Sequence, residues 1–102
     1  MAFASELYAA ATEVLTVDNT TGGVGFTTSK TLINGVRASK AIFVLEAGQC
    51  RFTVDGTTVT TTVGHLIEIG DVVTVEGAHA VRLFKAIRTG ATSGTAWATY
   101  FR

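Results

Sequence analysis

Short runs of β-branched and aromatic residues restrict the fold more than any other feature of this chain. Val, Ile, Thr, Phe and Tyr gather in brief segments, many of which alternate apolar and polar side chains, and Gly, Asn or Asp separates most of them. No apolar period of 3.6 residues is sustained along the chain, as a long amphipathic helix would require. The pattern therefore predicts an all-β fold.

The runs also fix where strands are expected. Their number and spacing are typical of two packed antiparallel sheets, so we expect an immunoglobulin-like sandwich of about seven or eight short strands. The predicted strands are residues 12–17, 24–28, 39–46, 50–54, 66–69, 72–76, 81–88 and 95–101.

Three details of these strands can be tested against a structure. Apolar residues on both faces of 39–46 predict a central strand. Residues 47–49 are short enough for a hairpin, and Gly70-Asp71 places Gly first, as a type II′ hairpin turn demands. Alternation breaks at Leu83-Phe84, so either a bulge lies there or both faces of 81–88 are covered.

The length of 102 residues fits one domain. We expect an N-terminal arm at 1–11 and a single β-sandwich domain at 12–102. The arm could form a short helical turn capped by Ser5, or it could dock on another molecule. The N-terminus lacks a basic segment and no apolar run approaches the length of a membrane span, which predicts a soluble protein not secreted by the usual routes.

The charge balance limits the classes of partner. Eight basic and eight acidic residues give no formal net charge, which argues against nucleic acid and membrane surfaces. Only 16% of the residues are charged, against about a quarter in typical domains, while 47% are hydrophobic. Such a surface favours association with other subunits, and the alternative is a surface covered by Thr.

The residues that carry most chemistry are few and scattered. His65 and His79 have no Cys or second His at a metal-ligand spacing. Asp55-Gly56 allows a calcium loop, but a turn in which Asp accepts local backbone hydrogen bonds explains it better. Cys50, the only cysteine, fits a core position. We therefore expect a non-enzymatic protein without a metal or cofactor.

Candidate binding residues fall into two groups. Trp97 and Tyr100 could stack on sugars in a carbohydrate-binding module. Such residues more often fill the core of a sandwich, and we expect this role for Trp97 on the final strand. The basic residues of 81–88 could line an acidic partner, or they could belong to an ordinary solvated face. The predicted partner contacts are the arm residues Phe3, Leu7 and Tyr8, the exposed threonines Thr58, Thr60 and Thr62, and the basic residues Arg82, Lys85 and Arg88.

Two resemblances involve the segment RFTVDGTTVTT, residues 51–61. The segment, followed later by FKAIRTG, resembles the strand-turn-strand pattern of immunoglobulin-like modules found beside chitobiase-type enzymes. Phe52 stands for the Tyr of that pattern and Val59 for its Pro. This likeness implies the sandwich fold and no activity.

A longer stretch, from about residue 38 to 102, resembles small structural proteins of tailed bacteriophages. The shared features are Asp55-Gly56-Thr57, Val63-Gly64-His65, Gly70-Asp71, residues 84–88 and the C-terminal Tyr-Phe-Arg. The resemblance implies a virion component made in the bacterial host cytoplasm, most plausibly a head decoration or cement protein on the capsid surface. Its expected partners are the major capsid protein and copies of itself, and the alternatives are a host-adhesion module that binds glycans and a head-to-tail or tail component.

Overall fold

The computed structural model describes residues 8–33 and 35–102. These residues form nine strands and two short helices, joined by turns and loops. In chain order these are β1 (Ala9–Val17), α1 (Thr28–Thr31), β2 (Leu32–Ile33), β3 (Val36–Arg37), β4 (Lys40–Ala47), β5 (Cys50–Thr53), β6 (His65–Ile67), β7 (Val72–Glu76), α2 (Ala78–Leu83), β8 (Lys85–Arg88) and β9 (Gly94–Phe101). Neither helix has the length and apolar character of a membrane-crossing segment.

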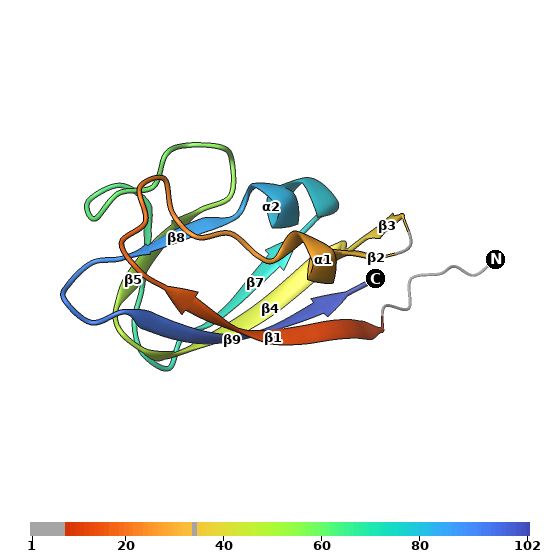
Figure 1. Ribbon diagram of the computed structural model, residues 1–102, viewed down its shortest axis with the longest axis horizontal. Coiled ribbons are helices and arrows are strands. Elements are labelled where there is room, and N and C mark those ends of the chain that lie inside the picture. The colour runs from red at the N-terminus through yellow and green to blue at the C-terminus, as the bar shows by residue number, and fades with distance from the viewer. Residues whose placement is uncertain (1–7, 34) are drawn as a thin grey trace.

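The strands form two packed sheets and a small ribbon (Figure 1). One sheet has the order β1-β9-β4-β7, the other has the order β6-β5-β8, and β2 pairs only with β3. Every pairing is antiparallel. The predicted all-β sandwich is confirmed, whereas its immunoglobulin-like topology stays a prediction.

The predicted central strand is confirmed as β4. This strand lies between β9 and β7 in the four-stranded sheet. Ala41, Phe43 and Leu45 are buried on its inner face, while Ile42 and Val44 are half-buried on the outer face. Apolar residues on both faces of a strand thus correctly indicated a position with neighbours on both sides.

Both predicted hairpins are wrong, because each connection carries the chain from one sheet to the other. β4 and β5 flank residues 47–49 but belong to different sheets, and so do β6 and β7 on either side of Gly70-Asp71. Gly70, with a φ of +94°, lies in a turn closed by the Asp71 N–H, which donates to the Glu68 carbonyl at 3.0 Å. The residues of a tight turn do not reveal whether the next strand pairs with the previous one.

The predicted strand at 81–88 is half wrong. Its first part belongs to helix α2, and only Lys85–Arg88 form a strand, β8. The break at Leu83-Phe84 therefore marks the end of the helix and not a bulge. Val81 and Phe84 are both buried, so this helix-to-strand junction covers one end of the core.

Two further boundaries differ from expectation. In place of the predicted strand at 24–28, the structure has an isolated bridge between Val24 and Ala86, and Thr28 already begins helix α1. The first strand begins at Ala9, so the last residues assigned to the arm already pair with β9.

Five aromatic rings join the two sheets in the core. Phe26 stacks on Phe84 with ring centroids 4.1 Å apart, and Phe43 meets Phe84 edge-on at 5.2 Å. Phe52, from the three-stranded sheet, meets Phe43 at 6.2 Å, and Tyr100, from β9, meets Phe26 at 5.1 Å. Each such pair contributes about 0.5–1.5 kcal/mol beyond the area that it buries.

Cys50 occupies the predicted core position. The thiol is fully buried, and burial raises its pKa to about 11. A Cβ at Gly94 would lie 2.4 Å from the Cys50 Sγ, so the sulfur occupies the space that the missing side chain of Gly94 leaves.

Candidate interaction surface

The outer face of the four-stranded sheet carries a row of apolar side chains that crosses all four strands. Val14 pairs with Trp97, Trp97 with Val44, and Val44 with Val72, so the four residues lie at one level of β1, β9, β4 and β7. We call this outer face the open face and these four residues the apolar row.

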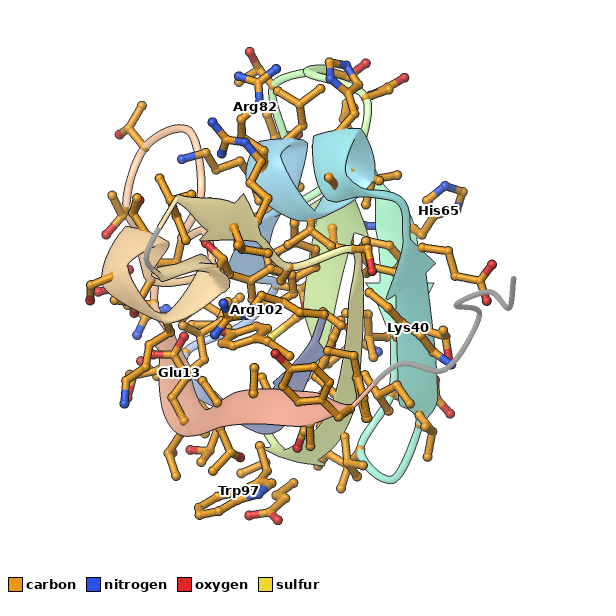
Figure 2. The ribbon with its side chains drawn as sticks, turned by 90° about the vertical axis from the view of Figure 1, so that its right-hand side faces the viewer. Glu13, Lys40, His65, Arg82, Trp97 and Arg102 are labelled. Carbon is orange, nitrogen blue, oxygen red and sulfur yellow. The ribbon has the colours of Figure 1, made fainter. Side chains whose placement is uncertain are left out.

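Most of the apolar row is accessible to solvent. The exposed fractions are 51% for Val14, 47% for Trp97 and 64% for Val72. Figure 2 shows Trp97 pointing away from the molecule, on the side opposite Arg82. A prominent tryptophan among exposed valines is the kind of patch that marks an interaction site.

The neighbouring row of the open face is also uncharged. It consists of Thr12, Thr99, Ile42 and Thr74, in the same strand order. The Thr12 hydroxyl donates to the Ala98 carbonyl at 2.7 Å and lies 3.4 Å from the Thr99 hydroxyl. Part of the polar surface of this row is thus already hydrogen-bonded within the sheet.

Charges flank these two rows. Lys40 and Glu76 are directly opposite each other on β4 and β7, at the end of the face where Phe101 lies. The Lys40 Nζ stands 5.6 Å from the centroid of the Phe101 ring, within the range of a cation–π contact. Glu46 follows at the other end of β4.

The three-stranded sheet has a different outer face, because the loop between β5 and β6 folds back over it. Val59, at the centre of this loop, is 1% exposed and borders a pocket together with Ile87 of β8. The Arg51 side chain donates to the carbonyls of Thr61 (3.0 Å) and Gly64 (2.9 Å). We call residues 54–64 the covering loop.

The predicted threonine contacts all lie on the covering loop. Thr58, Thr60 and Thr62 are exposed, as expected. Thr60 also shapes the loop, since its hydroxyl accepts hydrogen bonds from the N–H groups of Thr62 (3.2 Å) and Val63 (3.0 Å). Their role in partner binding stays a prediction.

The predicted basic contacts do not form one surface. Arg82 belongs to helix α2, where its guanidinium lies 3.2 Å from the His79 Nδ1. Lys85 and Arg88 are three residues apart on β8, so their side chains point to opposite faces of the strand. Arg88 donates to the Ser93 hydroxyl at 3.1 Å and is half-buried. A shared acidic partner for all three is therefore not supported by their placement.

The predicted arm is described only from Tyr8 onward, and Phe3 and Leu7 lie outside the described residues. Tyr8 is 64% exposed. Its backbone exchanges two hydrogen bonds of 3.1 Å with Arg102, which places it beside the C-terminal residue.

The two aromatic residues proposed for sugar stacking are separated. Trp97 lies on the open face, which contradicts the prediction of a core role, and Tyr100 is fully buried in the core. They are three residues apart on β9 and point to opposite sides of the sheet. Any stacking platform would therefore use Trp97 without Tyr100.

Glu13 was not singled out in the sequence, yet it joins three segments. Its carboxylate accepts hydrogen bonds from the Thr27 N–H (3.1 Å), the Thr27 hydroxyl (2.7 Å) and the Tyr100 hydroxyl. Burial, together with the nearby Glu13 carboxylate, raises the pKa of Tyr100. The group fixes the segment before α1 against the edge of β1, and only the tertiary fold brings its members together.

The turn interpretation of Asp55-Gly56 is confirmed. The Thr57 N–H donates to the Asp55 Oδ1 at 3.0 Å, which lowers the pKa of this carboxyl, and Gly56 has a φ of +91°. Asp55 and His65 border a pocket of ≈ 330 Å³. Within the described residues, no three His, Cys, Asp or Glu side chains form a group that could hold a metal ion.

No family model, curated protein or solved structure matches this chain. The likeness to phage structural proteins therefore stays a prediction based on the residues quoted above.

Proposed function

We propose that the protein is a non-enzymatic structural subunit that decorates the capsid shell of a tailed bacteriophage. The open face is the observation that carries this proposal. Its two central rows hold no charged residue across four strands, and its tryptophan is about half exposed. In a structural subunit, other subunits of the assembly would cover such an apolar face and thereby stabilise the folded protein.

The covering loop supports the same function on the opposite side of the sandwich. It is held by the Arg51 hydrogen bonds and by buried Val59, and it presents Thr58, Thr60 and Thr62 to solvent. A defined loop of this kind, whose one charged residue is Asp55, suits contact with a rigid protein lattice, because little conformational entropy is lost on binding. The N-terminal arm is a further proposed contact, and the structure describes only its exposed residue Tyr8.

Co-sedimentation with empty phage shells tests the proposal. We expect the purified protein to bind expanded shells of the major capsid protein saturably and to raise their resistance to heat. Thr58→Glu and Thr62→Glu should weaken binding, whereas Thr28→Glu, the same change at an exposed threonine of α1 outside both the covering loop and the open face, should bind like the wild type. Absence of saturable binding by the wild-type protein would overturn the assignment.

Carbohydrate binding is the second candidate function, and the half-exposed indole of Trp97 on the open face favours it. A glycan array separates the two functions. Glycan binding that disappears in Trp97→Ala, with the fold retained and shells not bound, would favour a host-adhesion module.

A further inference from the structure

The apolar row makes the open face self-complementary. In strand order, the apolar row reads Val14, Trp97, Val44, Val72, which is apolar from one edge of the sheet to the other. A two-fold symmetric interface brings the same patch of two subunits together, so it requires a patch of this self-complementary kind.

We propose that the open face packs against the open face of a second copy of this chain, around a two-fold axis that runs parallel to the strands between β9 and β4. The inference deepens the proposed function and rests on its statement that other subunits cover this face. It names the occupant as a second copy and fixes the orientation of the pair.

The symmetry determines which residues meet. Rotation about this axis lays β9 over the partner's β4 and β1 over the partner's β7. Trp97 then faces the partner's Val44, and Val14 faces the partner's Val72. Because the rotation preserves position along the strands, the whole apolar row meets its own copy.

The remaining rows are compatible with the same arrangement. Ile42 faces the partner's Thr99, so an aliphatic side chain meets the methyl group of a threonine. Lys40 faces the partner's Phe101, the ring type that it already contacts within one copy. Glu76 faces the start of the partner's β1, at the level of Ala9, so this row sets no carboxylate against another carboxylate.

The alternative two-fold axis, across the strands, is less favourable. It reverses position along the strands. Midway between the two rows, it would set the apolar row over the hydroxyl groups of Thr12, Thr99 and Thr74. Along the apolar row itself, it would set Ile42 over the partner's Glu46, an aliphatic side chain against a carboxylate. The parallel axis buries more apolar surface against apolar surface, which is the term that dominates most protein association.

The size of the face is sufficient for a specific dimer. Four strands spaced by about 4.8 Å, three of eight or nine residues and β7 of five, with a rise of about 3.3 Å per residue, span at most roughly 20 Å by 25 Å. Two such faces would bury on the order of 1,000 Å² in total, which reaches the lower size limit of specific interfaces. Trp97 would lie near the centre, where the strongest contacts of an interface concentrate.

The arrangement also has a consequence for the shell. The axis runs along the strands, so both copies of Tyr8 and Arg102 lie at the same end of the dimer. That end presents both Tyr8 side chains together, while the two covering loops lie on the outer sides of the dimer.

Sedimentation velocity on a matched pair of variants tests the dimer. Val14 on the open face and Val36 on β3 are both 51% exposed, so Val14→Lys and Val36→Lys are equivalent changes at different places. We expect the wild-type protein to dimerise and Val14→Lys to weaken the dimer about 100-fold, because it buries two unpaired ammonium groups. Val36→Lys should dimerise like the wild type.

Val72→Lys is the second variant on the open face and should act like Val14→Lys. Circular dichroism confirms that each variant folds. A wild-type protein that stays monomeric up to about 1 mM, or equal weakening by Val36→Lys, would overturn the inference.

Cross-linking tests the orientation. A mixture of Val14→Cys and Val72→Cys should give a heterodimer with a short bismaleimide, while neither variant alone should do so. The native Cys50 is buried and does not compete. A cross-link within Val14→Cys alone would contradict the parallel axis.

The shell experiment keeps the two proposals separate. A dimer that does not bind shells overturns the decoration function and leaves the self-pairing in place. A monomer that binds shells overturns the self-pairing alone.

Discussion

The two outer faces of the sandwich differ in what covers them. In the three-stranded sheet, Ile87 is buried beneath the covering loop of the same chain, whose Val59 is buried as well. The four-stranded sheet leaves Trp97, Val14 and Val72 accessible, and no described segment lies over them. One face thus contributes to the stability of the single subunit, while the other is available to a neighbour.

The contrast explains the low charge of the chain. Charged residues make up 16% of the sequence, and the two central rows of the open face contain none. Along the strands of a sheet with one solvated face, apolar residues that point inward normally alternate with polar residues that point outward. Apolar residues on the outer face of the sheet are the surface that the proposed association would cover.

The largest expected effect compares one substitution on the two faces. Val59→Asp should lower the free energy of unfolding by about 3–5 kcal/mol, because it buries an unpaired carboxylate. Val14→Asp should lower the stability of the monomer by only about 1 kcal/mol, since Val14 is half exposed and Asp is merely a poor strand residue there. Urea denaturation at low protein concentration measures both, and equal losses would remove the distinction between the faces.

A second comparison concerns two glycines of the covering loop. Gly64 has a φ of +130°, and a Cβ there would lie 2.9 Å from the Phe52 carbonyl oxygen and 3.0 Å from Val59. Gly56 also has a positive φ but has no atom within 4 Å of such a Cβ. We expect Gly64→Ala to cost about 2–3 kcal/mol and Gly56→Ala about 1 kcal/mol. Thermal unfolding measures both losses of stability. A larger loss in Gly56→Ala than in Gly64→Ala would show that the covering loop is not packed as described.

Arg51→Met tests the hydrogen bonds that hold the loop over its sheet. The loss of the bonds to the Thr61 and Gly64 carbonyls should destabilise the loop by about 1 kcal/mol. Amide hydrogen exchange of residues 60–64 should accelerate, while that of β1 and β9 stays unchanged. Arg88→Met, which removes a bond to Ser93, serves as the control and should leave exchange in the loop as in the wild type.

The last comparison concerns the layer between the two faces, and its effect is seen only at alkaline pH. Burial raises the pKa of Cys50 from 9.0 to about 11, so its thiol stays neutral in the folded state at a pH where the unfolded chain ionises. The corresponding stability is fully present below pH 9 and is lost as the pH rises toward 11. Cys50→Ala should flatten this decline, leaving the part due to Tyr100, whose pKa is also raised. Urea denaturation at several alkaline pH values would show the same slope in both proteins if Cys50 had no role.

Local patterns predicted the elements better than their partners. Alternation identified β4 and β9 and which of their residues share a face, because a strand's side chains follow a period of two. The turns at Gly48 and Gly70 were recognised as turns, yet both connect different sheets. Whether a turn joins strands of one sheet or of two depends on the packing of the core, in which Phe43 and Phe52 meet from opposite sheets.

The candidate surface depended even more on tertiary structure. The sequence placed Trp97, Thr99 and Phe101 on one side of β9 but did not reveal that this side faces outward. Glu13 and Tyr100 are far apart in the chain, so no local pattern connects them. The helix α2 was missed because its six residues are too few to show a helical period.

Trp97 is the only tryptophan of the chain, so its fluorescence reports directly on the open face. Acrylamide quenching measured over a wide range of protein concentration tests whether a second copy covers that face. We predict strong quenching at low concentration and marked protection, with a blue-shifted emission, as dimers form, and no such protection in Val14→Lys. An equal quenching constant at every concentration would contradict the account.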